Sequence, residues 1–263
     1  MFFDVLDCAR PGADTVLLSA GLGGTAGYWT PQLAALRERY RVITYDQAGT
    51  GRNRRELAAD HDIAAMADEA LAVLDATSTE TCHFVGHALG GLAGLDLALR
   101  RPDRLRSLTV VNGWAAAHAH TRRCFEVRLA VLEHGGPEAY VRAQAIFLYP
   151  ADWLAQNAHR MEREEAHGLA GFQGADTLKR RIAALLAFDA TPRLGSVRLP
   201  TLLQASRDDV LVPSSMSEKL AMAIGGATLR IAPWGAHALN VTEPDAFNAA
   251  LLDFLGRQTG RRP

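Results

Sequence analysis

The stretch "FVGHALGG", Phe84 to Gly91, decides how this chain folds. A strand-like run ends at Gly86, and the five residues from Gly86 to Gly90 follow the frame G-x-S-x-G with an alanine at the serine position. In that frame the middle residue stands on a strained strand-to-helix turn, so its neighbours must be small. The glycines meet this demand. The stretch therefore predicts such a turn, with Ala88 at the nucleophile-elbow position and no hydroxyl there to act as a nucleophile.

Outward from this turn, short buried strands closed by turns alternate with amphipathic helices. This alternation predicts an α/β chain with a mostly parallel sheet flanked by helices, and places a site at the carboxyl ends of the strands. The predicted strands are Thr15–Gly21, Arg41–Gly49, Cys82–Gly86, Ser107–Asn112, Thr201–Ser206 and Ala227–Ala232. The predicted helices are Trp29–Arg39, Ile63–Leu74, Ala88–Arg100 and Glu243–Gly256.

The segment 115–199 interrupts the alternation with several helical patterns and few strand-like runs. An ordinary pair of crossover helices is the alternative, but the segment is far longer than one crossover needs. We therefore predict a helical cap at 115–199, inserted into a core made of residues 1–114 and 200–263.

Composition narrows the class of protein. The chain has 263 residues, 48% of them hydrophobic, and a formal net charge of -1. This suits a large buried core and predicts neither a nucleic-acid partner nor a membrane span, since there is no basic excess and no run of 18 apolar residues. The N-terminus lacks the features of a signal peptide, and the three scattered cysteines indicate reduced thiols. We expect a cytoplasmic protein with a small-molecule substrate and with no cofactor or metal; homo-oligomerisation is left open.

Two glycine-rich turns predict donors for a developing oxyanion. One is the backbone N–H of Leu89, directly after the elbow. The other is the N–H of Leu22 in "SAGLGGTAGYW", which follows the first predicted strand. Glycine turns are common, so each alone is a weak signal, and their order after buried strands is what indicates a site.

An acid and a histidine follow in the order expected for such a site. "QASRDDVLVP" places two aspartates after the fifth strand, and Asp209 is favoured over Asp208 because it lies four residues before Pro213. "PWGAHALNV" places His237 in a loop after the last strand. Singly, Asp209 would suit a turn and His237 a structural loop, but together with the elbow they predict a catalytic pair. His87 is predicted to be a packed or hydrogen-bonded elbow residue rather than a base.

The chain resembles the α/β-hydrolase superfamily over nearly its whole length. More narrowly it resembles the RutD proteins of bacterial pyrimidine utilisation, through "GYWTPQLAAL", "YDQAGTGRN", "FVGHALGGLAGLDLAL", "VNGWAAAHAHTRRCFEVR", "FLYPADW", "FQG" and "GAHALNVTEP". The resemblance implies that alanine at the elbow is native to the family. Ala48 departs from it, because the family pattern "YDQRGTG" has arginine there.

The resemblance implies a late step of uracil breakdown. The implied reaction is hydrolysis of carbamate to ammonia and carbon dioxide, or of aminoacrylate to malonic semialdehyde and ammonia. Neither needs an acyl-enzyme, so water activated by His237 could replace the serine. These acidic substrates call for a cation or donor, and Trp114, Arg122 and Arg123 are the candidates near the start of the cap. The alternatives are a non-catalytic binding or scaffold protein of the same fold, and a serine hydrolase altered at position 88.

Overall fold

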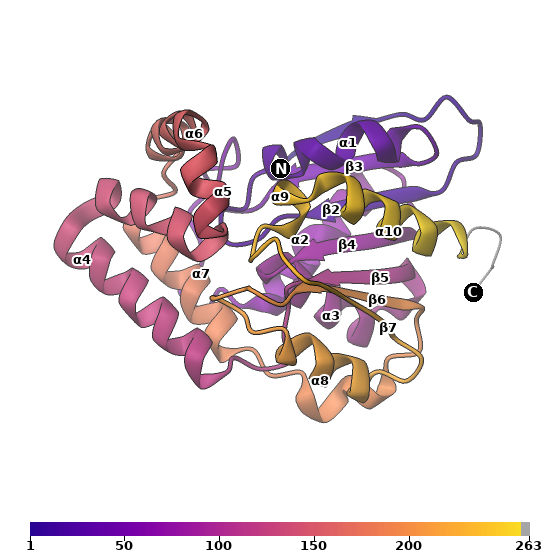
Figure 1. The fold of residues 1–263 in the computed structure, drawn as a ribbon. Coiled ribbons are helices and arrows are strands. Elements are labelled where there is room, and N and C mark those ends of the chain that lie inside the picture. The colour runs from indigo at the N-terminus through magenta and orange to yellow at the C-terminus, as the bar shows by residue number, and fades with distance from the viewer. Residues whose placement is uncertain (259–263) are drawn as a thin grey trace.

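A seven-stranded sheet in the order β1-β3-β2-β4-β5-β6-β7 runs through the centre of the molecule (Figure 1). The computed structural model describes residues 1–258, so the last five residues of the predicted core segment 200–263 lie outside the described residues. Every pairing is parallel except that of β1 with β3, which confirms the predicted α/β class with a mostly parallel sheet. The strands are β1 Phe2–Leu6, β2 Thr15–Ser19, β3 Arg41–Asp46, β4 Cys82–His87, β5 Leu105–Val111, β6 Thr201–Ser206 and β7 Thr228–Ala232.

The prediction of six strands was one short, because β1 was missed. This edge strand pairs antiparallel with β3, with Phe2 opposite Asp46 and Val5 opposite Ile43. Its side chains are only half-buried, so its sequence lacks the continuous apolar run that marks the central strands. A partner some forty residues away in the sequence, rather than a local pattern, makes this segment a strand.

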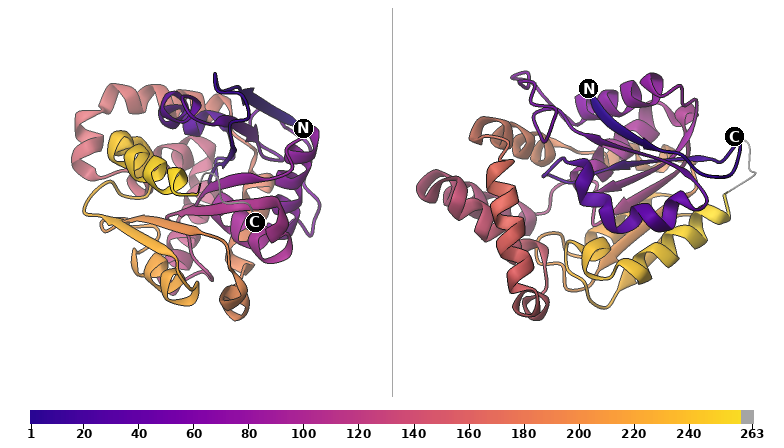
Figure 2. Two further views of the ribbon diagram at one scale, coloured as in Figure 1. Left: turned by 90° about the vertical axis from the view of Figure 1, so that its right-hand side faces the viewer. Right: turned by 90° about the horizontal axis from the view of Figure 1, so that it is seen from above.

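Helices cover both faces of the sheet (Figure 2). On one face Trp29, fully buried, packs against Phe247 with ring centroids 6.5 Å apart, in a cluster that ties the start of α1 to α10. On the other face a larger apolar cluster joins α2, α3 and α8; the short helix α8 was not predicted. The helices of the core are α1 Thr30–Arg37, α2 Ile63–Ala76, α3 Leu89–Arg100, α8 Ser215–Ala223, α9 Leu239–Thr242 and α10 Pro244–Gly256, with 3₁₀ turns η1 Ala26–Trp29 and η2 Pro102–Arg104.

Four helices lie between β5 and β6, in the segment that we propose as a cap (left in Figure 1). The first, α4, has left-handed backbone at Gly136 (φ 76°), followed by Pro137, so it consists of two helical halves joined at a kink. The cap contacts the loops at the carboxyl ends of the strands, where the N–H of Ala238 donates to the Leu148 carbonyl at 2.9 Å. Its helices are α4 Ala119–Leu148, α5 Ala151–Gln156, α6 Ala158–Ala170 and α7 Ala175–Ala187, followed by the 3₁₀ turn η3 Thr191–Ser196.

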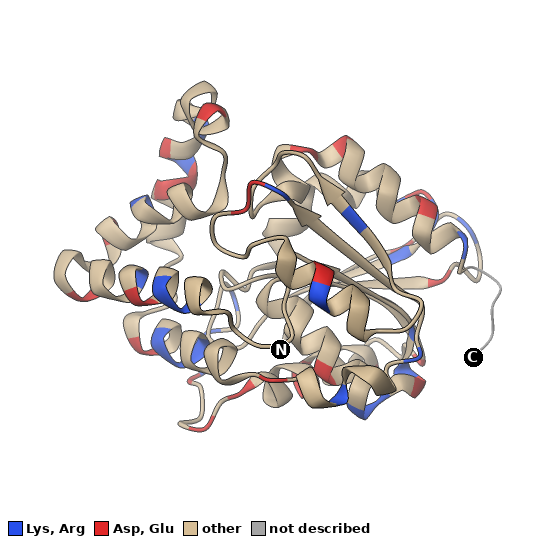
Figure 3. Ribbon diagram, turned by 60° about the horizontal axis from the view of Figure 1, so that its bottom comes forward, with Lys and Arg blue, Asp and Glu red and all other residues tan. Residues whose placement is uncertain are grey.

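The surface carries both signs of charge. Acidic and basic residues are interspersed along the helices of core and cap (Figure 3). Within residues 1–258, no helix combines the length and the apolar character that a membrane span requires. The same residues contain no group of three or more His, Cys, Asp or Glu side chains placed to hold a metal ion.

The turn between β4 and α3 brings backbone against backbone. A Cβ atom added to Gly90 would lie 2.3 Å from the Ser19 carbonyl oxygen, and one added to Gly86 would lie 2.4 Å from the Gly90 carbonyl oxygen. Such distances are far below van der Waals contact, and backbone cannot swing away as a side chain can. The first turn of α3 therefore rests directly on β2 and β4, and only glycine fits at these two positions.

We predict that Gly90→Ala destabilises the fold by more than about 3 kcal/mol, above the usual range for overpacking a core. The matched control is Gly256→Ala at the end of α10, where an added Cβ meets nothing within 4 Å. There the change should be neutral or stabilising by up to about 1 kcal/mol, because alanine favours helix over glycine. Urea unfolding followed by circular dichroism measures both, and equal midpoints for the two variants would contradict the prediction.

Candidate active site

Ala88 stands on the turn in the conformation that the elbow frame requires. Its backbone angles, φ 45° and ψ -112°, lie outside the regions that residues with a Cβ normally occupy. Such strain costs on the order of 1–3 kcal/mol and persists only where the surroundings impose it. Here the Ala88 N–H donates to the Val111 carbonyl at 2.8 Å, and the Ala88 carbonyl accepts from Leu92 N–H at 3.0 Å. Leu89 is the first residue of α3, so its N–H has no acceptor within the helix.

The loop after β2 presents the second predicted donor. Gly24 N–H donates to the Gly21 carbonyl at 3.0 Å and closes a tight turn around Leu22. The Leu22 carbonyl points toward the cap, where it accepts from Gln173 Nε2 at 3.2 Å. Among residues 1–258 the Leu22 N–H makes no hydrogen bond, and Leu22 and Leu89 line the same cavity. Both predicted donors are thus available at one place.

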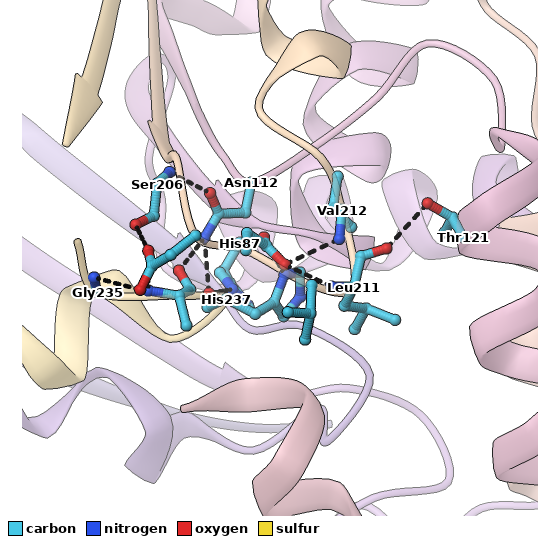
Figure 4. A network of polar contacts seen from close by, with 12 residues as sticks. His87, Asn112, Thr121, Ser206, Leu211, Val212, Gly235 and His237 are labelled. Carbon is cyan, nitrogen blue, oxygen red and sulfur yellow. Dashed lines mark hydrogen bonds and ion pairs between the residues drawn. The ribbon is translucent and has the colours of Figure 1, made fainter. Parts of the chain in front are cut away.

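His237 and Asp209 form a buried pair in the loops that follow β7 and β6. Figure 4 shows His237 with two residues that contact its backbone, His87 and Asn112. His237 Nδ1 and Asp209 Oδ2 are 2.7 Å apart, and Asp209 Oδ1 accepts from the N–H groups of Leu211 and Val212, each at 2.8 Å. Since a carboxylate oxygen can only accept from the ring, Nδ1 carries the proton and Nε2 is left as the basic nitrogen. The pair therefore has the orientation of a general base with its supporting acid.

The neighbouring aspartate has a different task. Asp208 accepts from the N–H groups of Gly235 at 3.3 Å and Ala236 at 2.9 Å, and also from the Ser206 hydroxyl. Asp208 thus contacts the backbone of the loop that carries His237, called the histidine loop below, and not the imidazole. Asn112 adds to this hold by donating from Nδ2 to the His237 carbonyl at 2.7 Å.

His87 also acts on the backbone of His237. Its Nε2 lies 2.8 Å from the His237 carbonyl oxygen, and because a carbonyl only accepts, Nε2 carries the proton. Burial, and then the nearby His237, hold the pKa of His87 well below its ordinary value of 6.5. The ring is therefore neutral at physiological pH and holds the histidine loop, in agreement with its predicted role as a hydrogen-bonded elbow residue.

A cavity of about 130 Å³ between core and cap joins these groups. Besides His87, its lining includes five of the candidate site residues, and Asp209 lies behind one of them, hydrogen-bonded to it. The five are Leu22, Ala88, Leu89, Trp114 and His237.

Arg122 and Arg123 do not line this cavity, so the geometry does not support the prediction that they bind substrate here. Both are exposed on α4, and Arg122 donates to the Leu186 carbonyl at 2.8 Å. The phase of the helix accounts for their position, since Cys124, Phe125 and Arg128 lie on its inward face. The buried cation of this helix is therefore Arg128, which lines the cavity and which sequence reasoning missed. Its spacing of three and four residues from Phe125 and Cys124 is the signal that could have found it.

Arg181 on α7 was missed as well. It is fully buried, donates to Gln47 Oε1, and has the carbonyl oxygens of Gly21, Leu22 and Ala48 within 3.4 Å. Burial lowers the pKa of its guanidinium to about 10, so it remains charged at neutral pH. Arg181, a cation of the cap, thus contacts the carbonyls of the loop after β2 that contains Leu22. It also contacts Ala48, the position at which the family pattern has arginine.

Comparison with known proteins agrees with this geometry. Residues 14–145 match the model of the family described as "alpha/beta hydrolase fold". The chain is similar over 97% of its length to the crystal structure of a hydrolase from Pseudomonas aeruginosa PA01, covering 93% of that chain, with a TM-score of 0.85 and 29% identity. The enol-lactonase from Burkholderia xenovorans LB400 gives a TM-score of 0.87 at 25% identity, covering 97% of this chain and 95% of that one. Fold and site thus define an α/β hydrolase, as the sequence predicted.

Curated relatives identify the family within the α/β hydrolases to which the chain belongs. A protein of Caulobacter sp. (strain K31), named "Putative carbamate hydrolase RutD", is 54% identical over 241 residues, which is 92% of this chain and 90% of the relative. One of the same name from Pseudomonas savastanoi pv. phaseolicola is 49% identical, covering 98% of this chain and 100% of the relative. The chain therefore belongs to the RutD family of α/β hydrolases.

We predict that His87 makes the fold sensitive to acid. Below pH 6.5 the unfolded chain takes up a proton on this ring, whereas the folded chain, with its lowered pKa, does not. Stability is therefore full above pH 6.5 and is lost as the pH falls, by up to about 1.4 kcal/mol per pH unit for this one proton. Urea unfolding between pH 7 and 5 should show a shallower loss for His87→Gln than for the parent. The exposed His159→Gln is the control and should follow the parent; a His87→Gln slope equal to the parent's would contradict the prediction.

Proposed function

We propose that this protein is a hydrolase of pyrimidine breakdown that accelerates the hydrolysis of carbamate to ammonia and carbon dioxide, with water activated by His237 and without a serine nucleophile. The names of the curated relatives support the substrate. The observation that carries the mechanism is the buried His237–Asp209 pair at 2.7 Å, on a cavity whose elbow residue is alanine. Because Ala88 has a methyl group where a hydrolase serine has its hydroxyl, the nucleophile has to come from solvent.

The proposed steps balance without a covalent intermediate. His237 Nε2 takes a proton from water while the water oxygen adds to the carbamate carbon. The N–H groups of Leu22 and Leu89 donate to the oxyanion that develops. The C–N bond then breaks, its electron pair leaves with nitrogen, and the imidazolium returns the proton. Carbamate and water give ammonia and bicarbonate, the hydrated form of carbon dioxide.

Aminoacrylate is the second candidate substrate. The same imidazole can move the protons that convert this enamine into an imine and add water to it, giving malonic semialdehyde and ammonia. The walls of the cavity favour this candidate in one respect. Leu148, Leu185 and Leu211 provide apolar surface, which suits the carbon–carbon bond of aminoacrylate and has no counterpart in carbamate.

We predict that His237→Ala lowers kcat/KM by about 10²–10⁴-fold, the usual contribution of a general base. Asp209→Asn should lower it less, because the imidazole remains but loses its orienting carboxylate. Stopped-flow assays with freshly prepared carbamate, and with aminoacrylate generated in the cuvette, measure both. The exposed cap residue variant His159→Ala serves as control and should match the parent. Unchanged turnover in a folded His237→Ala would rule out the proposed base, and no acceleration by the parent would support the scaffold alternative.

We predict that Ala88→Ser converts the site into one that can be acylated. The backbone already holds residue 88 at φ 45°, so the serine inherits the elbow geometry, with the basic nitrogen of His237 on the same cavity. With an activated ester such as p-nitrophenyl acetate, Ala88→Ser should show a burst of about one equivalent, whereas the parent shows none.

The control for this experiment is the double variant Ala88→Ser/His237→Ala, which keeps the hydroxyl and removes its base. It should give no burst, and mass spectrometry should find an acetyl group only on the single variant. A folded single variant without burst or adduct would show that the imidazole cannot reach residue 88.

A further inference from the structure

Arg128 is a buried cation without an acid. Its side chain lies on the inward face of α4, is 2% exposed, and lines the catalytic cavity. Both of its hydrogen bonds leave from Nη2, one to the Tyr140 hydroxyl and one to Gln144 Oε1, each at 2.9 Å. Both acceptors are neutral, since burial raises the pKa of Tyr140. Among residues 1–258 no carboxylate pairs with this guanidinium.

Three aromatic rings lie around the guanidinium, and of these only Tyr140 uses one of its donors, through the hydroxyl. Its central carbon lies 5.0 Å from the centroid of Phe125, 5.4 Å from Tyr140 and 5.7 Å from Phe147. Cation–π attraction offsets part of the cost of burying the charge, but ring faces do not replace a hydrogen-bond acceptor of opposite charge. The Nε N–H is buried and has no acceptor in the described part of the chain.

The kink in α4 produces this arrangement. Phe125 and Arg128 belong to its first half, whereas Tyr140, Gln144 and Phe147 come after Gly136. The second half thus returns toward the first and encloses the guanidinium between them. Such a placement requires the positive φ at Gly136.

The cavity offers Arg128 no other counter-charge. Among the described residues that line the cavity, Arg128 is the only Lys, Arg, Asp or Glu. Asp209 lies behind His237, and both of its oxygens already accept hydrogen bonds. An uncompensated buried charge is unfavourable, and an anion entering the cavity would relieve it.

We propose that Arg128 binds the carboxylate, or the carbamate CO₂⁻ group, of a small monoanionic substrate, with the amide of Gln144 as a second donor. The proposal rests on the proposed function, because it names the class of molecule that the His237 site takes. Gln144 also lines the cavity, and its Nε2 makes no hydrogen bond within residues 1–258. In this arrangement the core supplies base and oxyanion donors, and the cap supplies the cation that selects an anion.

The two candidate substrates would use this cation differently. In aminoacrylate water adds to the carbon that bears nitrogen, and the carboxylate, which is not attached to that carbon, keeps its charge throughout, so Arg128→Gln should raise KM and leave kcat nearly unchanged. In carbamate the bound group is the reacting group, and adding water concentrates negative charge on it. There the same variant should lower kcat as well as raise KM. The split between the two constants therefore distinguishes the substrates.

A binding experiment tests the proposal without turnover. Propionate and propionamide have nearly the same shape and differ in charge, and calorimetry compares their affinity for the purified protein. The parent should bind propionate at least about tenfold more tightly, as charge-assisted hydrogen bonds imply. Arg128→Gln should lose this preference and Arg128→Lys should keep part of it. Arg122→Gln, an exposed position on the same helix, should match the parent. Equal affinities in the parent, or an unchanged preference in Arg128→Gln, would overturn the proposal.

A second measurement needs no variant and covers the case in which Arg128→Gln fails to fold. In ¹⁵N-labelled parent protein, the Nε–H resonance of Arg128 should shift on titration with propionate and stay in place with propionamide. An Arg128 resonance that ignores both ligands would overturn the anion site. Absence of carbamate and aminoacrylate turnover, with the propionate preference intact, would instead refute the proposed function.

Discussion

The contact between the first turn of α3 and the backbone of β2 is the constraint on which the rest of the site depends. Gly90 lies so close to the Ser19 carbonyl that no side chain fits between them. This contact, together with the hydrogen bond from Ala88 to Val111, holds residue 88 at positive φ and leaves the Leu89 N–H without an intrahelical acceptor. Backbone and glycine make the turn, so the geometry does not require a serine at its apex.

The histidine loop is held in the same way, by contacts to its backbone. Asn112 and His87 both donate to the His237 carbonyl, and Asp208 accepts from Gly235 and Ala236. These groups come from the ends of three strands, so the position of the imidazole depends on the register of the sheet. Asp209 instead contacts the ring itself, with Oδ2 2.7 Å from Nδ1 of His237. Burial keeps His87 neutral. His237 is the imidazole of this site that is paired with a carboxylate.

Core and cap contribute different kinds of charge. The core carries the His–Asp pair and two backbone donors, whereas the cap carries two buried arginines. Arg181 contacts the carbonyls of the loop that contains Leu22, and Arg128 contacts the cavity itself. The proposed binding of the substrate by Arg128 and the position of the loop that contains Leu22 thus both depend on how the cap packs on the core.

The sequence by itself determined the central features, because their causes are local. A strained turn demands the glycines around Ala88, buried parallel strands demand continuous apolar runs, and the order of the loops follows from chain order. Asp209, His237, Leu22 and Leu89 could be selected on these grounds, and the structure brings all four to one cavity or directly behind it. Only the tertiary structure decided the rest. The segment that became β1 needed a distant partner strand, and the choice of Arg128 over Arg122 and Arg123 depended on which face of α4 the core and the returning half of the helix cover. Arginines close together in sequence carry the same charge, and burial by the returning half of α4 is what distinguishes Arg128 from its two neighbours.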